Sequence, residues 1–392
     1  MKSLNILLII LFIAHCSMAQ QITSANHDSI MDKARHYESQ FQFDTALQLY
    51  ESMLKSDSSN VQILARAGHC SYQSGRLKLS EKYFKEIILH DSVNKRALAQ
   101  LANIALKRGN HLQAKDIFLK LTTLDSLNSY YYKKLGEIYT KLQQDSLAEK
   151  HFLHALSLNR KDMTTIKSLA NLQYQMKKFD SALKTIKKGL MLDSSNKKLH
   201  RIKLRSQFKL KNYEQAIYCG EKLIHQGDTS TTVLKTTGVS AFRLKLYKRT
   251  INYLQQLPEE EKNMTINYYL GICYREVSKF DKSLVSFNQA IEKGIPAIYH
   301  RFFIQKGMAF EDIKEFPKAI KTYRRGYQIT QKPVLLFHLA RMYDYFYKDK
   351  EPALNHYEKY VNSSRSNRIY TTYSNQRIEA LREHLHFNQS NE

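Results

Sequence analysis

Small and aromatic residues recur along this chain at an interval of 34 residues. One unit carries Leu135, Gly136 and Tyr139, followed by Ala148 and Phe152. The corresponding residues of other units are Ala67, Gly68, Ser80 and Phe84; Leu101, Ala102, Ala114 and Phe118; Leu169, Ala170 and Ala182; Leu270, Gly271 and Phe287; and Lys306, Gly307, Ala319 and Tyr323. Apolar positions within each unit follow helical spacing in two successive stretches. The pattern therefore predicts pairs of helices that approach closely at the small residues.

About ten units account for most of the chain. A degenerate unit runs from 27 to 60, and a last one starts near Pro333. The regular units are predicted to begin at Val61, Lys95, Ser129, Met163, Lys197, Thr231, Met264 and His300. The unit at Lys197 departs from the pattern, because Lys203 and Leu204 replace the Leu-Gly pair and Gly220 replaces the aromatic residue.

The repeated motif resembles the tetratricopeptide repeat (TPR). The resemblance covers residues 27–362 and implies an all-α fold, a right-handed α-solenoid of helix-turn-helix units. Only 12 Gly and 5 Pro in 392 residues, with 43% apolar residues, agree with a helical chain that has a continuous core. Residues 363–392 are interpreted as a C-terminal capping helix and tail, since helical spacing resumes after a polar break. A frayed tail is the alternative.

The first 19 residues have the pattern of a signal peptide. Lys2 precedes a short apolar run, which is too short to span a bilayer, and cleavage is expected between Ala19 and Gln20. Lipidation at Cys16 is an alternative, although His15 precedes it. Residues 20–26 would form a short linker. We therefore expect a bacterial protein exported to the periplasm, associated with the outer membrane or secreted, without a transmembrane segment in its mature chain.

The sequence carries no recognisable motif of catalysis or of cofactor binding. It contains no HExxH motif, no Gly-rich phosphate loop and no Cys/His zinc spacing. His151 and His154, beside Glu149, share a helix face, but a solvated face is the preferred interpretation. Three widely spaced cysteines, Cys70, Cys219 and Cys273, are expected to be core thiols. The sequence predicts a protein without enzymatic activity, cofactor or metal.

Positive charge is concentrated on the first helices of successive units. The formal net charge is +25, and the TPR resemblance implies that positions 2, 5, 9, 12 and 13 of each unit line a concave wall. The residues predicted to bind a partner there are Lys133, Lys167, Lys198, Arg201, Arg205, Phe208, Lys209, Lys235, Phe242 and Arg243. The basic wall is expected to end near residue 260. A solvated face in a generally basic chain remains the competing interpretation.

The leading hypothesis is an exported scaffold that holds a protein partner of the cell envelope, through an acidic segment of that partner. The alternative is an envelope glycan-binding or assembly accessory protein, in which exposed Tyr130, Tyr174, Phe208 and Phe242 would stack on sugars. A homo-oligomeric spacer is also open, and the oligomeric state is not predicted. Nucleic acid is not the expected partner, because the signal peptide argues against it and no recognition motif is present.

Overall fold

The chain is helical throughout the part that the structure describes. The computed structural model describes residues 28–293, 299–363 and 368–389, and contains no strand there. The predicted signal peptide, its linker and Cys16 lie outside the described residues. No described helix combines the length and the apolar character that crossing a bilayer requires. The chain divides after Ser194 into two compact units, the first ending at Ser194 and the second beginning at Ser195.

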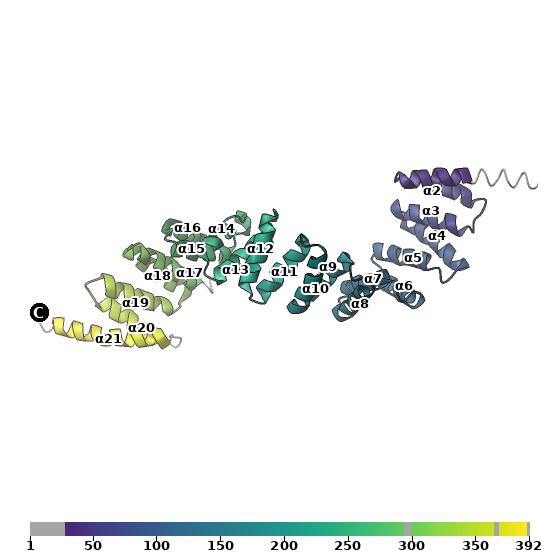
Figure 1. Ribbon diagram of the computed structural model, residues 1–392. Helices are drawn as coiled ribbons and strands as arrows, with labels where there is room; N and C mark the ends of the chain where they lie inside the picture. Colours follow the sequence, from purple (N-terminus) through teal and green to yellow (C-terminus); the bar gives the residue numbers. More distant parts are fainter. Residues whose placement is uncertain (1–27, 294–298, 364–367, 390–392) are drawn as a thin grey trace, which may run out of the picture. The chain divides into compact units, whose positions relative to one another are not determined.

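The helices of each unit follow one another in pairs (Figure 1). The first unit contains a helix over 28–39, α2 (Phe43–Leu54), α3 (Val61–Gln73), α4 (Leu77–His90), α5 (Lys95–Lys107), α6 (His111–Leu124), α7 (Ser129–Lys141), α8 (Asp145–Leu158), α9 (Met163–Gln175) and α10 (Phe179–Leu192). The second unit contains α11 (Lys197–Lys209), α12 (Tyr213–His225), α13 (Thr231–Arg243), α14 (Tyr247–Leu254), a 3₁₀ turn (Glu259–Glu261), α15 (Met264–Glu276), α16 (Phe280–Glu292), α17 (Tyr299–Asp312), α18 (Phe316–Thr330), α19 (Val334–Phe346), α20 (Glu351–Val361) and α21 (Arg368–Gln389).

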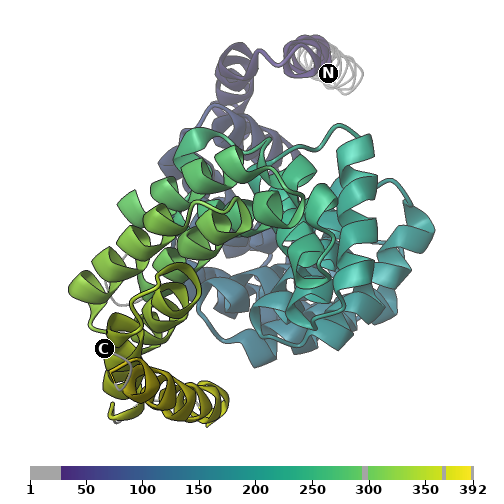
Figure 2. The same cartoon turned by 90° about the vertical axis from the view of Figure 1, so that its left-hand side faces the viewer.

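The described helices form ten consecutive pairs, which confirms the predicted all-α repeat fold. In seven of the eight regular repeats, the first helix begins at the predicted residue. The eighth begins at Tyr299, one residue before the predicted His300. Helices that are neighbours in the sequence pack side by side within each unit (Figures 1 and 2). The main contacts between alternate helices all join first helices of pairs, namely α7 with α9, α11 with α13, α15 with α17 and α17 with α19.

The small residue at position 8 of a unit lets the two helices of its pair approach. A Cβ atom added to Gly136 would lie 2.6 Å from Cδ1 of Phe152, a ring that is 1% exposed. Gly271 faces Phe287 in the same way. Even a methyl group at these two glycines would require the facing ring to shift, so the absence of a side chain permits the close approach. The same glycine–aromatic contact recurs in the pairs that begin at Val61, Ser129, Met264 and Tyr299, so the repeat pattern reflects a recurrent packing contact.

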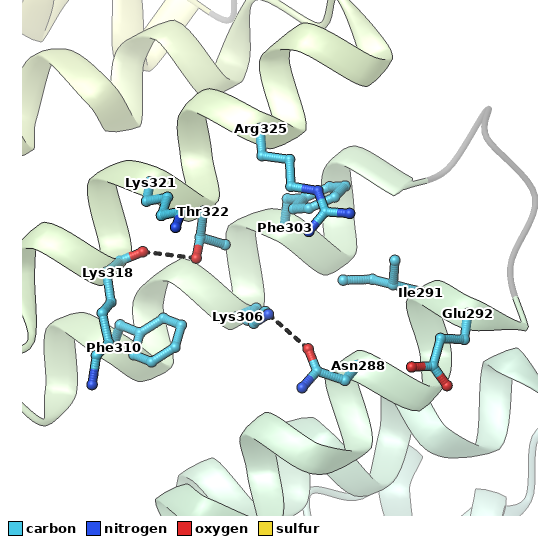
Figure 3. A pocket seen from close by; sticks show the side chains of 10 residues that line it. All are labelled: Asn288, Ile291, Glu292, Phe303, Lys306, Phe310, Lys318, Lys321, Thr322 and Arg325. Carbon is cyan, nitrogen blue, oxygen red and sulfur yellow. Dashed lines mark hydrogen bonds between the residues drawn. The ribbon is translucent and has the colours of Figure 1, made fainter.

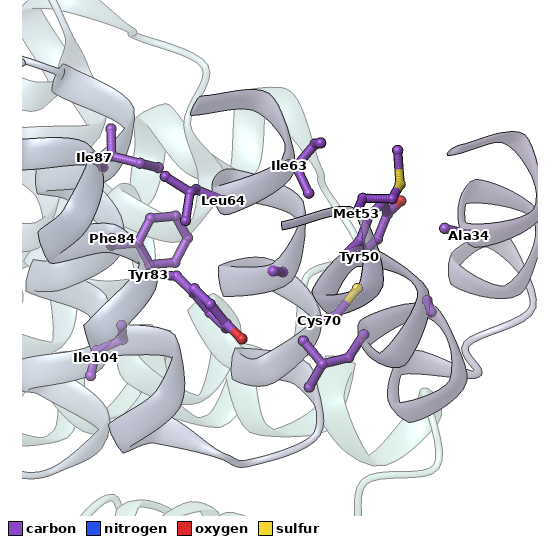
Figure 4. Close-up of a cluster of buried hydrophobic side chains, with 14 residues drawn as sticks. Ala34, Tyr50, Met53, Ile63, Leu64, Cys70, Tyr83, Phe84, Ile87 and Ile104 are labelled. Carbon is purple, nitrogen blue, oxygen red and sulfur yellow. The ribbon is translucent and has the colours of Figure 1, made fainter. Parts of the chain in front are cut away.

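Apolar residues from successive pairs form the core of each unit. In the first unit, Tyr50, Ile63, Phe84 and Ile104 belong to one buried cluster (Figure 4). Cys70 lies in the same cluster, and burial raises the pKa of its thiol to about 12. Cys219 and Cys273 are also buried and unbonded to each other, so the prediction of core thiols is confirmed.

Asparagine or aspartate side chains cap the first helices of six pairs, α3, α5, α7, α9, α11 and α15. The Asn128 side chain accepts a hydrogen bond from the Tyr130 N–H, and Asn60, Asn94 and Asn196 cap their helices in the same way. Such caps satisfy backbone donors that no helical carbonyl can reach. At these six helices the cap marks the predicted start.

Helix α21 covers the end of the last pair, as predicted for a capping helix. It packs on α20 and buries Ile378 and Leu381. Its Tyr370 ring stacks on Phe337 of α19 at a centroid distance of 4.4 Å. The Arg377 guanidinium donates two hydrogen bonds to the Asp344 carboxylate, at 2.9 and 3.0 Å. The last apolar face of the second unit is therefore covered by the chain itself.

Candidate functional site

The predicted binding residues fall in two groups, one in each of the two compact units into which the chain divides. Lys133 of α7 and Lys167 of α9 lie in the first unit. The other eight lie on α11 and α13, which contact each other in the second unit. We call these eight residues the α11–α13 basic face: Lys198, Arg201, Arg205, Phe208, Lys209, Lys235, Phe242 and Arg243. We treat it as the candidate site, since a single unit holds it.

The sequence of α11 explains why its basic residues face away from the core. Leu199, Ile202 and Leu204 are at most 4% exposed, and they follow helical spacing. Lys198 and Lys209 occupy the remaining face and are exposed. The α11 helix therefore has one apolar face in the core and one cationic face in solvent.

Arg201 has an acidic partner that the sequence analysis did not identify. Its Nε donates a hydrogen bond of 2.6 Å to the Asp228 carboxylate, which lies in the loop before α13. The Asp228 side chain is 3% exposed. The bond from Arg201 lowers the pKa of the Asp228 carboxyl, and the bond from Ser230 adds to this effect against the cost of burial. Arg201 thus joins α11 to the loop that leads into α13.

Lys133 makes the equivalent contact in the first unit. Its Nζ lies 3.1 Å from the carboxylate of Asp162, which also caps α9 through the N–H groups of Thr164 and Thr165. Burial raises the pKa of this carboxyl, but the Thr165 hydroxyl and then Lys133 together bring it below its ordinary value. Lys133 and Arg201 therefore have a structural role between repeats, which lessens their availability to a partner.

Four cations of the basic face have no acidic partner in the described chain. No carboxylate oxygen lies within 4.0 Å of Lys198, Lys209, Lys235 or Arg243 among those residues. Lys198, Lys209 and Arg243 are exposed, whereas Lys235 is half-buried. These four side chains retain a charge that an acidic ligand could neutralise.

The two phenylalanines of the basic face are partly used in packing. Phe208 meets the Tyr213 ring edge-on at 5.9 Å, and Phe242 stacks on Tyr269 at 4.1 Å. Tyr130 donates a hydrogen bond to Asn103. The four aromatic residues Tyr130, Tyr174, Phe208 and Phe242 are all half-buried. The prediction that these rings are exposed is therefore wrong, because neighbouring helices cover much of each ring.

After α13, the first helices of the pairs carry acidic residues that form ion pairs with arginines. Arg275 lies 3.5 Å from Asp312, and Arg341 lies 3.2 Å from Glu311. Each carboxylate is thus matched by an arginine of a neighbouring helix pair. The basic character of the first helices gives way there to paired charges.

The histidines near Glu149 belong to an aromatic stack. His151 stacks on Tyr139 at 5.1 Å, and His154 lies 4.1 Å from the ring of Tyr132. Burial lowers the pKa of His151. Among the described residues, no three His, Cys, Asp or Glu side chains are grouped so that they could hold a metal ion.

Comparisons with known proteins agree with this geometry. A family model described as "Tetratricopeptide repeat" matches residues 129–162, the pair α7 and α8. No curated protein matches the sequence.

Three of the solved structures that match this chain are the following. A Pseudomonas aeruginosa PilF structure is 18% identical, covers 53% of this chain and 95% of its own, and has a TM-score of 0.45. YrrB, described as a TPR protein with an unusual peptide-binding site, is 18% identical, with 47% and 96% coverage and a TM-score of 0.42. A tetratricopeptide repeat protein from Parabacteroides merdae is 15% identical, with 63% and 98% coverage and a TM-score of 0.42.

The matched pair is one of ten. Contacts equivalent to Gly136–Phe152 occur in the pairs that begin at Val61 and Met264. These two pairs lie in different compact units of the chain. The pair α7 and α8 thus matches the tetratricopeptide repeat family, and the other described pairs repeat the same helix-turn-helix arrangement.

Proposed function

We propose that this protein is an exported scaffold that binds an envelope protein partner through the α11–α13 basic face. Tetratricopeptide-repeat proteins are in general interaction scaffolds without catalytic activity. The observation that carries the proposal is the set of four cations without an acidic partner on two contacting helices. A partner segment rich in Asp and Glu would satisfy these charges, and the exposed parts of Phe208 and Phe242 would add apolar contact.

The proposed location follows from the N-terminal sequence alone. The apolar run after Lys2 and the small residues before Gln20 support export to a periplasm, the outer membrane or the exterior. The protein is proposed to have no enzymatic activity. The glycan-binding alternative has less support, since its four proposed sugar-stacking rings are half-buried.

The test compares two charge-reversed variants of the mature protein in cross-linked pull-downs from the host envelope. The first variant is Lys198→Glu/Lys209→Glu/Arg243→Glu, which spares the Arg201–Asp228 pair. The second is Lys248→Glu/Lys279→Glu/Lys282→Glu, which makes the same charge change at exposed residues elsewhere in the second unit. Circular dichroism establishes that both are folded.

A protein recovered by wild type and the second variant, but not by the first, would support the proposal. That partner should bind purified wild type with a Kd that rises with salt concentration. Equal recovery by the first variant would refute a site on the basic face. Equal loss in both variants would show that net charge, and not this face, drives the association.

A further inference from the structure

A lysine in the second unit occupies a position that other repeats give to a buried leucine. Lys306 of α17 directly precedes Gly307, the glycine at position 8 of its unit. Leu135 and Leu270 hold the same position in two other helix-pair repeats, where these residues are 0% and 4% exposed. A lysine at a core position desolvates its charge, so the local sequence conflicts with the packing pattern. Such conflicts are expected at functional sites.

Lys306 lies in a pocket between α16, α17 and α18 (Figure 3). The cavity has a volume of about 300 Å³. Helix α18 contributes three further cations to its lining, Lys318, Lys321 and Arg325. Phe303 and Phe310 of α17 contribute aromatic walls. The pocket therefore has aromatic walls from α17 and positive groups from both α17 and α18.

Three of the four cations that line this pocket have no acidic partner in the described chain, whereas the fourth, Lys318, forms an ion pair with Glu315. The Lys306 ammonium donates a hydrogen bond of 2.6 Å to the neutral Asn288 side chain. No carboxylate of the described chain lies within 4.0 Å of Lys306, Lys321 or Arg325. Glu292 also lines the pocket, and it forms no ion pair with them.

The surroundings of Lys306 disfavour its charged form. Burial lowers the pKa of its ammonium group, and the nearby positive charge of Arg325 lowers it further. An anion in the pocket would raise the pKa of Lys306 again. Its negative charge would stabilise the buried ammonium group and would offset the repulsion between Lys306 and Arg325. The cationic pocket is therefore suited to a compact anion with more than one negative charge.

We propose that this pocket binds a phosphate group, with Lys306, Lys321 and Arg325 as its cationic contacts. A phosphate at neutral pH carries up to two charges and several acceptor oxygens, which matches three donors better than a single carboxylate does. Phe303 and Phe310 leave an apolar wall against which the carrier of a phosphate ester can lie. The site uses α16–α18 and is independent of the proposed α11–α13 basic face.

The experiment titrates the full mature protein with inorganic phosphate and with glycerol 3-phosphate by calorimetry at constant ionic strength. Acetate serves as the monovalent oxyanion control. The test variant is Lys306→Met, which replaces the charge with an apolar chain of similar length. The matched control is Lys248→Met, which removes one exposed positive charge from α14.

Wild type and Lys248→Met are expected to bind phosphate equally, and Lys306→Met at least about tenfold more weakly, as for loss of a charge-assisted hydrogen bond. Tighter binding of glycerol 3-phosphate would identify a phosphate ester as the ligand, and tighter binding of inorganic phosphate would identify the free ion. The proposal is overturned if phosphate does not bind wild type, if Lys306→Met binds it equally well, or if acetate binds as tightly.

Discussion

His338 is a titratable side chain held in the core of the second unit. It lies on α19, is 6% exposed, and stacks on the Tyr323 ring at 5.1 Å. Burial lowers its pKa to about 4, and the positive charge of Arg341 acts in the same direction. The imidazole is therefore neutral in the folded protein at pH values where it would be partly charged in an unfolded chain.

Stability should fall as the pH is lowered from about 6.5 to about 4. In this window the unfolded chain binds a proton at His338 and the folded chain does not, so acid favours unfolding. The contribution of this residue reaches about 3 kcal/mol. Denaturant unfolding of wild type and His338→Phe at pH 7.5 and 4.5 measures it.

The His338→Phe variant should lose clearly less stability between the two pH values than wild type does. It keeps an aromatic ring beside Tyr323 and removes the titratable group. Some dependence should remain, because burial also lowers the pKa of His151 and His356. An identical loss in the variant and wild type would contradict the assignment.

Individual residues show what the sequence could and could not reveal. The basic positions of α11 were predictable, since their spacing places them on one face. Their partner Asp228 was not, because a loop carboxylate meets Arg201 only once the next pair is packed in place. The half-burial of Phe208 and Phe242 likewise depends on neighbouring helices. Whether the basic face binds a partner stays a prediction.

At the scale of helices, the irregular unit at Lys197 has a packing explanation. Elsewhere position 8 is small and the residue 16 positions later is large, as in Gly136 and Phe152. Here the sizes are exchanged, because Leu204 is 1% exposed and Gly220 stands at the later position. A Cβ on Gly220 would lie 1.8 Å from the hydroxyl oxygen of Thr237. The departure from the motif therefore serves the contact between α12 and α13.

Helix boundaries were the most predictable feature of the fold. Caps such as Asn128 and the 34-residue period are both local signals. The start of α17 was missed by one residue, and this unit follows an irregular spacing. The division of the chain after Ser194 was not predicted, since the repeat pattern continues across it.

Removal of α21 should destabilise the last helix pair. Truncation after Ser363 would expose an apolar cluster that includes Leu336, Phe337 and Tyr360. We expect increased binding of a hydrophobic dye and a lower unfolding temperature, since an uncovered repeat end presents a large apolar patch.

The control for the truncation is Arg377→Gln, which breaks the ion pair with Asp344 but leaves α21 in place. It should lower stability only slightly, because the arginine side chain is 37% exposed and its interaction is screened by solvent. Dye binding should stay at the wild-type level. If the truncated protein also matches wild type in both measurements, α21 has no capping role.

At the scale of the whole molecule, the net charge of +25 opposes compactness. Raising the salt concentration from about 10 mM to about 100 mM shortens the screening length from about 30 Å to about 10 Å. The unfolding temperature should therefore rise over this range, because repulsion within the folded chain weakens. Thermal unfolding followed by circular dichroism at a series of salt concentrations measures the effect.

The Lys248→Glu/Lys279→Glu/Lys282→Glu variant should respond less to salt, as its net charge is lower. A fall in the wild-type unfolding temperature with salt would mean that attractive pairs such as Lys133–Asp162 outweigh the repulsion.

The turn within each helix pair has a consequence for how such a chain can change its length. In the seven pairs whose first helices begin between Val61 and Met264, a residue with positive φ stands 14 positions after that start, as at Gln143, Lys245 and Ser278. This interval is kept although the pair that begins at Thr231 spans 33 residues and the one at Met264 spans 35. In these two pairs, the change in length therefore lies beyond the turn, in the second helix or in the loop that follows it. The rigid hairpin is the module that gene duplication can copy, and the joints between copies are where evolution can add or remove residues.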